Sequence, residues 1–265
     1  MAEPLTITYG KAAVSVYRAD EACNLFAAEV DLVAHGDVFL SSYTEGDNSQ
    51  VVATDSMKNF IHACALEFEG TSLEEFLALV GRSFLDRYEH VERVTLEGRE
   101  PTFERRGGVL YQQLYGDRGV AWLDVGRDGI RDHRSGRERL HLVKLRGNAF
   151  RGFLRDEYTT LPDADDRPLF IHLDARWRHA DFEKRVPGEA VRDALAATFD
   201  DFVSESIQHL VYEMGVRVLE RFEDIEQVEF DAQNRLWDTA LTGDGVKVYT
   251  DARPPFGVIH LTLKR

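Results

Sequence analysis

The chain has 265 residues, of which 43% are hydrophobic and 30% are charged, as in a folded globular protein rather than a disordered one. Its formal net charge of −15 repels nucleic-acid phosphates, so nucleic acid is not expected as a partner. No apolar run approaches the roughly 18 residues that span a membrane, and no signal peptide is recognisable at the amino terminus. Cys23 and Cys64 are the only cysteines, which fits a reducing compartment. These features predict a cytoplasmic protein without a membrane partner.

The first part of the chain predicts two strands and a helix. Residues 7–9 and 14–17 have strand character and flank a turn that holds Gly10 and Lys11. Residues 27–42 are predicted to form a second strand. A helix is predicted over residues 54–69, with Thr54 as its N-cap and Asp55 favourably placed in the first turn.

A second helix and a set of hairpins follow. Ser72 and Glu75 have the spacing of a capping box, ahead of an apolar stripe at helical spacing that runs to Leu85. An extended segment is predicted to begin near Val91. Residues 105–145 contain several glycines, Gly136 among them, and are predicted to form hairpins broken at these glycines.

An internal repeat indicates how the chain is organised. Residues 85–96 match residues 219–230 without gaps, with five identities and an offset of 134 residues. Such a repeat predicts two copies of one supersecondary unit, placed at residues 1–136 and 137–265. Each unit is predicted to be α+β, with helices on one face of an antiparallel sheet. Because a lone unit of this kind leaves sheet edges open, oligomerisation is expected to close them into a barrel.

Common catalytic and binding motifs are absent from the sequence. There is no His-Glu-x-x-His and no Cys-x-x-Cys, and His62 and Cys64 are two residues apart, a spacing that does not share a helix face. No Walker loop, dinucleotide fingerprint or Gly-x-Ser-x-Gly elbow is present. The sequence therefore predicts neither a metal nor a nucleotide cofactor.

Three polar segments remain as candidates for a site: residues 51–59, residues 155–167 and residues 206–208. The first begins a predicted helix, whose free backbone N–H groups suit an anion or a carbonyl oxygen. Taken singly, each segment is more often a helix cap or a surface salt bridge than a functional site. Composition alone therefore favours a structural role for each of them.

Together with other segments in the same order along the chain, these residues resemble the urate oxidase family. The similarity covers nearly the whole chain, and its two longest segments, Thr-Asp-Ser-Met-Lys-Asn and Leu-Arg-Asp-Glu-Tyr-Thr-Thr, are specific. The segments similar to the family signatures are Tyr9-Gly10-Lys11, residues 52–59, residues 152–160, Asp166-Arg167, Ile207-Gln208, Asn234 and residues 257–262.

The resemblance implies a fold, an assembly and a reaction. Two tandem tunnelling-fold units per chain are implied, with four chains closing barrels around a tunnel and active sites lying between subunits of the homotetramer. The implied reaction is the cofactor-independent oxidation of urate by molecular oxygen and water to 5-hydroxyisourate and hydrogen peroxide. Because urate is an anion and the chain is acidic, its site is expected to be a local basic pocket.

The resemblance also assigns catalytic roles. Lys11 and Thr54 are implied to be the catalytic pair, in which the lysine removes a proton from urate and relays it through the threonine. A partly buried lysine of lowered pKa suits this role. Asn234, with Thr54, is implied to hold oxygen or peroxide. Many family members have a histidine two residues after this asparagine, where this chain has Leu236. Either the Lys11–Thr54 pair works without this histidine, or a histidine distant in sequence takes its place, with His260 as the first candidate.

Five residues are implied to bind the purine, together with Thr54 and Asn234. Asp55 and Ile207 contribute backbone N–H groups. Arg167 offers a planar two-pronged donor, and Gln208 reads the opposite edge of the pyrimidine ring with a donor and an acceptor. Phe150 stacks on the heterocycle.

Two alternatives remain open. The first is a non-catalytic purine-binding or structural relative with the same fold, although a binding module has no use for the oxygen-side residues. The second is a pteridine enzyme of the same fold class, which usually needs a zinc cluster that this sequence does not predict.

Overall fold

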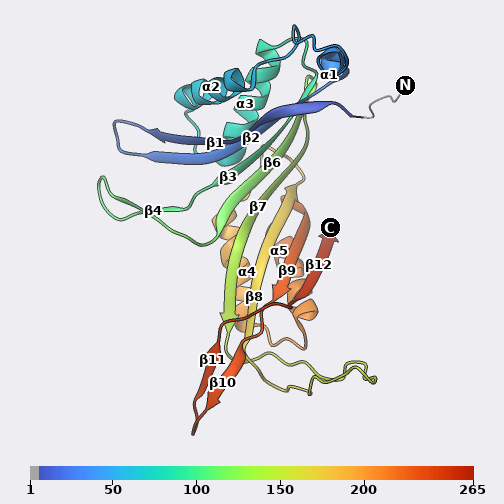
Figure 1. The fold of residues 1–265 in the computed structure, drawn as a ribbon. Helices are drawn as coiled ribbons and strands as arrows, with labels where there is room; N and C mark the ends of the chain where they lie inside the picture. The colour runs from blue at the N-terminus through green and yellow to red at the C-terminus, as the bar shows by residue number, and fades with distance from the viewer. Residues whose placement is uncertain (1–5) are drawn as a thin grey trace. The chain divides into compact units, whose positions relative to one another are not determined.

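The computed structural model describes residues 6–265 and divides into two compact units, the first ending at Ser135 and the second covering Gly136–Arg265 (Figure 1). Strand β7 (Gly129–Lys144) begins in the first unit and continues in the second. Within the described residues, no helix is long and apolar enough to cross a membrane.

The first unit is an antiparallel sheet covered on one face by two helices. Its strands follow the order β1-β2-β3-β6-β7. Alternate residues of β2 are buried, among them Val30 and Leu32 at 0% exposure, because one face carries the helices and the other does not. The elements are β1 (Thr8–Ala19), β2 (Leu25–His35), η1 (Asp37–Phe39), α1 (Leu40–Thr44), α2 (Thr54–Glu67), α3 (Leu73–Arg87), β3 (Arg93–Glu100), the hairpin β4 (Phe103–Arg105) and β5 (Tyr111–Gln113), and β6 (Arg118–Gly126).

The second unit has the same plan, with strand order β7-β8-β9-β12. Its core packs two helices on one sheet face, with Leu210, Val211 and Met214 fully buried against Phe230. The elements are β8 (Leu169–His179), α4 (Gly188–Asp201), α5 (Ile207–Arg221), β9 (Ile225–Asn234), the hairpin β10 (Asp238–Thr242) and β11 (Lys247–Thr250), and β12 (Gly257–Lys264). The predicted α+β class is therefore confirmed.

The repeated segment has the same structure in both units. Helix α3 ends at Arg87 and α5 at Arg221, and each is followed by a turn and a strand. In both units an arginine donates hydrogen bonds to the carbonyl oxygens around the end of this helix. Arg127 reaches Leu85, Tyr88 and Val91; Arg265 reaches the equivalent Leu219, Phe222 and Ile225. These cations satisfy orphan carbonyls at the negative end of the helix dipole.

The helix starts are predicted with mixed success. The capping box at α3 is confirmed, because the Ser72 side chain accepts from the Glu75 N–H and the Glu75 carboxylate accepts from the Ser72 N–H. The prediction that Thr54 caps α2 is wrong: Ala53 is the N-cap and Thr54 is the first helical residue.

Three predicted boundaries are also wrong. The expected turn at Gly10 and Lys11 is instead part of the continuous strand β1, which contains a β-bulge. The strand expected over residues 27–42 ends at His35, because Gly36 at φ 151° leads into the helical turns η1 and α1. The expected break at Gly136 does not occur, because β7 runs through it.

Candidate functional site

Lys11 lies next to a β-bulge that determines which sheet face it occupies. Lys11 pairs with Leu32 and Val14 with Val30, so β1 has one residue more than β2 across this interval. The bulge includes Ala13 at φ 56°, whose N–H donates to the Asp31 carboxylate at 2.6 Å. Directly paired residues share a face, so Lys11 lies on the same side as buried Leu32. The bulge therefore places Lys11 on the helix-bearing face.

The residues before Lys11 connect β1 to the start of α2. A Cβ at Gly10 would collide with the Leu32 carbonyl oxygen, so this position accepts only glycine. The Tyr9 hydroxyl accepts a hydrogen bond from the Val52 N–H at 2.8 Å, and burial raises the pKa of this phenol. Tyr9 is two residues before Lys11, and Val52 is two residues before Thr54. This hydrogen bond therefore connects the strand that carries Lys11 to the start of the helix that carries Thr54.

Thr54 and Asp55 are the first two residues of α2, and both are exposed. Backbone N–H groups in a first helical turn have no intrahelical acceptor. The Asp55 carboxylate turns back to Lys58 at 2.6 Å; this hydrogen bond and the Lys58 charge lower its pKa, with a smaller contribution from Lys11. Lys11 thus lies within electrostatic reach of the α2 start, and the exposed N–H groups there suit an acceptor atom.

In the second unit, Arg167 is a half-buried cation. Its Nε is buried and has no hydrogen-bond partner among residues 6–265. The guanidinium lies over the Phe150 ring, 5.3 Å from its centroid, and burial lowers the pKa of Arg167. A buried, uncompensated cation is costly. The site is therefore organised to receive an anion or a strong acceptor.

Ile207 and Gln208 begin α5. Ile207 is buried at 5% exposure, whereas Gln208 is exposed. The Ser206 N-cap side chain accepts from the His209 N–H, so the N–H groups of the first two helical residues remain for another acceptor. Helix α5 therefore presents donors at its start, as α2 does.

Asn234 ends β9, where it pairs with Ile171 of β8 and Gly257 of β12. Because paired residues share a face, Asn234 lies on the helix-bearing side with fully buried Ile171. Its Oδ1 is buried and has no hydrogen-bond partner in the described part of the chain. Arg167 directly precedes Pro168 and β8, so both unpartnered groups belong to this end of the sheet.

Two buried polar residues that sequence reasoning missed hold the Arg167 segment. Asn148 is 2% exposed and Ser204 is 0% exposed, and the Ser204 hydroxyl donates to Asn148 Oδ1 at 3.2 Å. The Asn148 carbonyl accepts from the Arg167 N–H, and the backbone of Ser204 bonds to Gly147 and Ala149 on either side of Asn148. Only the Gly147-Asn148 dipeptide in a loop was available as a sequence signal, and it marks turns far more often than sites.

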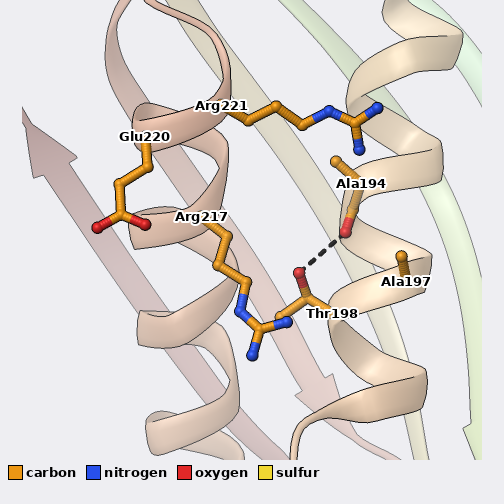
Figure 2. Close-up of a pocket in the computed structure, with 6 residues that line it drawn as sticks. All are labelled: Ala194, Ala197, Thr198, Arg217, Glu220 and Arg221. Carbon is orange, nitrogen blue, oxygen red and sulfur yellow. Dashed lines mark hydrogen bonds between the residues drawn. The ribbon is translucent and has the colours of Figure 1, made fainter.

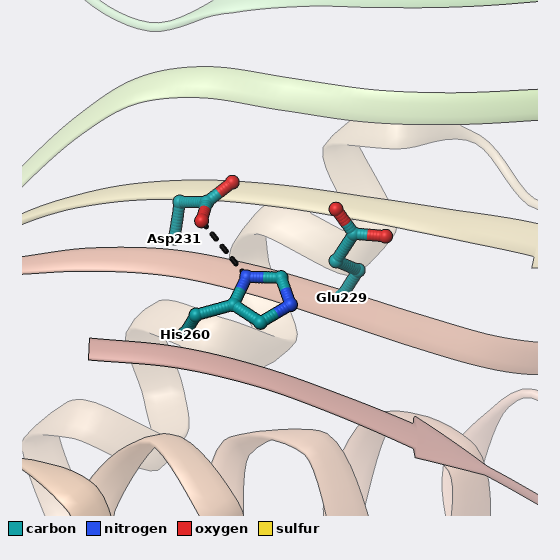
Figure 3. Close-up of side chains that lie close together, drawn as sticks. All are labelled: Glu229, Asp231 and His260. Carbon is teal, nitrogen blue, oxygen red and sulfur yellow. Dashed lines mark hydrogen bonds and ion pairs between the residues drawn. The ribbon is translucent and has the colours of Figure 1, made fainter.

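His260 does not fill the position beside Asn234 in its own chain. It pairs with Asp231 across β12 and β9, and its Nδ1 lies 2.9 Å from the Asp231 carboxylate (Figure 3). Asp231 and Asn234 are three residues apart in an unbroken register, so their side chains lie on opposite faces. Leu236 follows β9 and is partly exposed at 36%.

Glu229 lies near this pair, and the three side chains bring potential metal ligands within 4.8 Å of one another (Figure 3). However, the second Asp231 oxygen is already bound to Arg176 at 3.0 Å. Arg176 also binds Glu138 at 2.8 Å. The cluster is thus part of an exposed ion-pair network, which explains its composition without a metal.

A pocket of about 320 Å³ lies between α4 and α5 (Figure 2). It contains none of the predicted site residues, and its Arg217 is neutralised by Asp201 and Glu213, both at 2.7 Å. We therefore place the candidate site elsewhere. The pocket is lined by Ala194, Ala197, Thr198, Arg217, Glu220 and Arg221.

The predicted site residues form two groups. The first unit holds Lys11, Thr54 and Asp55, which we call the proton-side group. The second unit holds the other five, which we call the purine-side group: Phe150, Arg167, Ile207, Gln208 and Asn234.

Fold and site together define a tandem α+β protein whose helix starts and half-buried arginine suit a planar, anionic ligand. Comparison with known proteins identifies the family within this class. A family model described as Uricase matches residues 7–107 and 133–260. The uricase of Halalkalicoccus jeotgali is 36% identical, over 98% of both chains. The chain therefore belongs to the uricase family.

Solved structures agree with this assignment. Urate oxidase from Bacillus sp. TB-90 superposes with a TM-score of 0.92 at 36% identity, covering 98% of this chain and 100% of the other. Uricase from Arthrobacter globiformis gives a TM-score of 0.92 at 28% identity, covering 100% and 96%. The chain spans about half, 52%, of the uric acid degradation bifunctional protein of Bacillus sp. TB-90, to which it is 39% identical over 88% of its own length.

Proposed function

We propose that this chain is a urate oxidase that needs no cofactor. Urate, molecular oxygen and water give 5-hydroxyisourate and hydrogen peroxide. Two electrons pass from urate to oxygen, which also takes up two protons, and the oxygen atom of water becomes the new hydroxyl. Deprotonated urate is electron-rich, so the protein has to bind the anion, remove a proton, exclude bulk water and position oxygen.

The observation that carries the proposal is Arg167. In a chain with a net charge of −15, this guanidinium is half-buried against Phe150, and its buried Nε has no hydrogen-bond partner among residues 6–265. Urate is a planar anion with adjacent oxygen and nitrogen atoms. The arginine fork matches such a pair, while the ring of Phe150 offers a stacking surface.

The remaining purine contacts come from helix starts. The N–H groups of Ile207 and Asp55 suit urate oxygen or nitrogen atoms because neither has an intrahelical acceptor. The exposed amide of Gln208 supplies a donor and an acceptor to the pyrimidine edge. Gln208→Leu therefore raises the KM for urate, since the leucine leaves that edge unpaired.

Proton removal is assigned to Lys11 and Thr54. The bulge in β1 turns Lys11 toward the helix-bearing face, and the Tyr9 bond to Val52 ties its strand to the start of α2. The lysine amine accepts the proton and the Thr54 hydroxyl passes it on. The Asn234 side chain orients the oxygen or peroxide together with Thr54: its amide N–H can donate to either, and its Oδ1, which has no partner among residues 6–265, can accept from peroxide. With Leu236 in place of histidine, ordered water completes the route.

Assembly into a homotetramer is part of the proposal. We assign the proton-side group of one subunit and the purine-side group of another to each active site. The exposure of Thr54, Asp55 and Gln208 supports this, because residues that enclose a substrate need a covering surface. The free thiols of Cys23 and Cys64 accord with a cytoplasmic location.

The direct test follows urate by its ultraviolet absorbance, with oxygen uptake and peroxide measured in the same sample. One oxygen consumed and one peroxide formed per urate are expected, in protein dialysed against a strong chelator. Activity that disappears on chelation and returns with one metal contradicts the cofactor-independent reaction. Tight binding of urate without turnover instead identifies a purine-binding relative.

A further inference from the structure

The Arg167 segment and the start of α5 are joined by a buried polar connection. The Asn148 side chain makes three hydrogen bonds: Nδ2 donates to the carbonyl oxygens of Arg146 at 3.2 Å and Arg167 at 3.3 Å, and Oδ1 accepts from the Ser204 hydroxyl at 3.2 Å. Ser204 lies three residues before Ile207. The Asn148 amide therefore connects the Arg167 segment to the residues just before α5.

Backbone hydrogen bonds follow the same connection. The Arg167 N–H donates to the Asn148 carbonyl at 2.9 Å, and the Ala149 N–H donates to the Ser204 carbonyl at 2.8 Å. The Ser204 N–H returns to the Gly147 carbonyl at 3.1 Å. Phe150, directly after Ala149, thereby becomes fixed relative to both Arg167 and α5.

Burial makes this connection unusual for a loop. Asn148 and Ser204 are 2% and 0% exposed, and polar groups at such depth are tolerated only when their hydrogen bonds are satisfied. Satisfied buried networks rigidify what they join. Apolar side chains at these two positions would stabilise the fold equally well. The polar pair of Asn148 and Ser204 therefore indicates that the two segments must be held in one defined geometry.

We propose that Asn148 and Ser204 are positioning residues that set the spacing between the Arg167 guanidinium and the donors at the start of α5. We call this pair the Asn148–Ser204 clamp. It rests on the proposed function, because the spacing matters for a rigid ligand, such as a purine, that contacts Arg167 and Gln208 at once. The clamp touches no reacting atom, so it affects the binding of the purine ring rather than the chemical step.

Ser204→Ala tests the clamp with little disturbance, because it removes one hydroxyl and keeps the backbone bonds. Ser135→Ala is the matched control: Ser135 is 2% exposed and donates to Glu74 at 2.6 Å, outside the purine-side group. The loss of one buried hydrogen bond that controls geometry should raise KM for urate about tenfold. The kcat should stay within about twofold, because the lost contacts act equally in ground and transition states.

Two further readouts separate the clamp from the proposed function. Xanthine, which shares the pyrimidine ring of urate, should bind Ser204→Ala about tenfold more weakly than the unmodified or Ser135→Ala protein. Amide hydrogen exchange in residues 145–168 should be faster in Ser204→Ala than in Ser135→Ala. The clamp is refuted if exchange in this segment is the same in both variants, or if both variants raise KM equally. If the unmodified protein neither oxidises urate nor binds xanthine, the proposed function is wrong, and the exchange rates alone decide on the clamp.

Discussion

Replacing Arg167 with methionine should separate function from stability. The guanidinium is half-buried and lies 5.3 Å from the centroid of the Phe150 ring, and its buried Nε has no hydrogen-bond partner among residues 6–265. Its pKa is lowered by burial, a sign that the charged form is disfavoured in the unliganded protein. Methionine fills similar volume without the charge. We therefore expect Arg167→Met to unfold at the same or a higher temperature while losing urate oxidation.

The magnitude follows from two opposing effects. Removing an unpaired, partly desolvated charge stabilises by about 1–2 kcal/mol, the lower part of the range for buried ions. Losing the cation–π contact costs about 0.5–1 kcal/mol. The net gain is about 1 kcal/mol, or roughly 2–4 °C in Tm for a chain of this length.

Arg137→Met is the matched control in the same unit. The buried Arg137 guanidinium, 3% exposed, donates at 3.2 Å to the exposed Glu189 carboxylate, so its removal loses a charged hydrogen bond and should cost about 2 kcal/mol. Thermal unfolding of both variants, beside their kcat/KM for urate, gives the comparison. The reasoning is refuted if Arg167→Met is destabilised as much as Arg137→Met, or if it keeps the unmodified kcat/KM.

Three other perturbations test separate parts of the account. Tyr9→Phe removes the acceptor for the Val52 N–H and should lower kcat several-fold with little change in KM, measured by steady-state urate kinetics; an unchanged kcat counts against the link. Lys11→Ala and Thr54→Ala should each lose most of kcat and the double variant little more, since they act as one unit; additive losses contradict the pair. Burial holds the pKa of His35 below its usual 6.5, so the unfolded chain binds this proton more readily and stability falls as pH drops through 6.5 and below. His35→Gln should lose less Tm between pH 7 and pH 5, and equal losses in both proteins refute this.

The sequence predicted the elements that depend on local signals. The capping box of Ser72 and Glu75 correctly predicted the start of α3, and the repeat correctly predicted that residues 85–96 and 219–230 each form a helix end, a turn and a strand, because both signals lie in neighbouring residues. The predicted element boundaries were wrong where local backbone geometry differed from what the hydrophobic pattern indicated. The interval from Gly10 to Val14 lacks a regular alternation because of the bulge, and a turn was the simpler interpretation.

The candidate site was predictable only through its resemblance to a known family. Polar residues at helix starts, such as Thr54 and Gln208, look like ordinary surface until a fold brings neighbours to them. Arg167 was recognisable as a candidate, but the burial of its Nε without a hydrogen-bond partner among residues 6–265 is a property of packing alone. Asn148 and Ser204 are 56 residues apart, and no local pattern predicts that two small polar residues meet in a core.

The central claim is that the proton-side and purine-side groups form one active site from two subunits. Lys11→Ala and Arg167→Ala chains are each expected to be inactive. When equal amounts are unfolded and refolded together, half of the pairs are mixed, and each mixed pair restores one of its two sites, so about a quarter of the unmodified activity should return. Activity that stays at the level of the separate variants, in tetramers shown by mass spectrometry to be mixed, contradicts the claim.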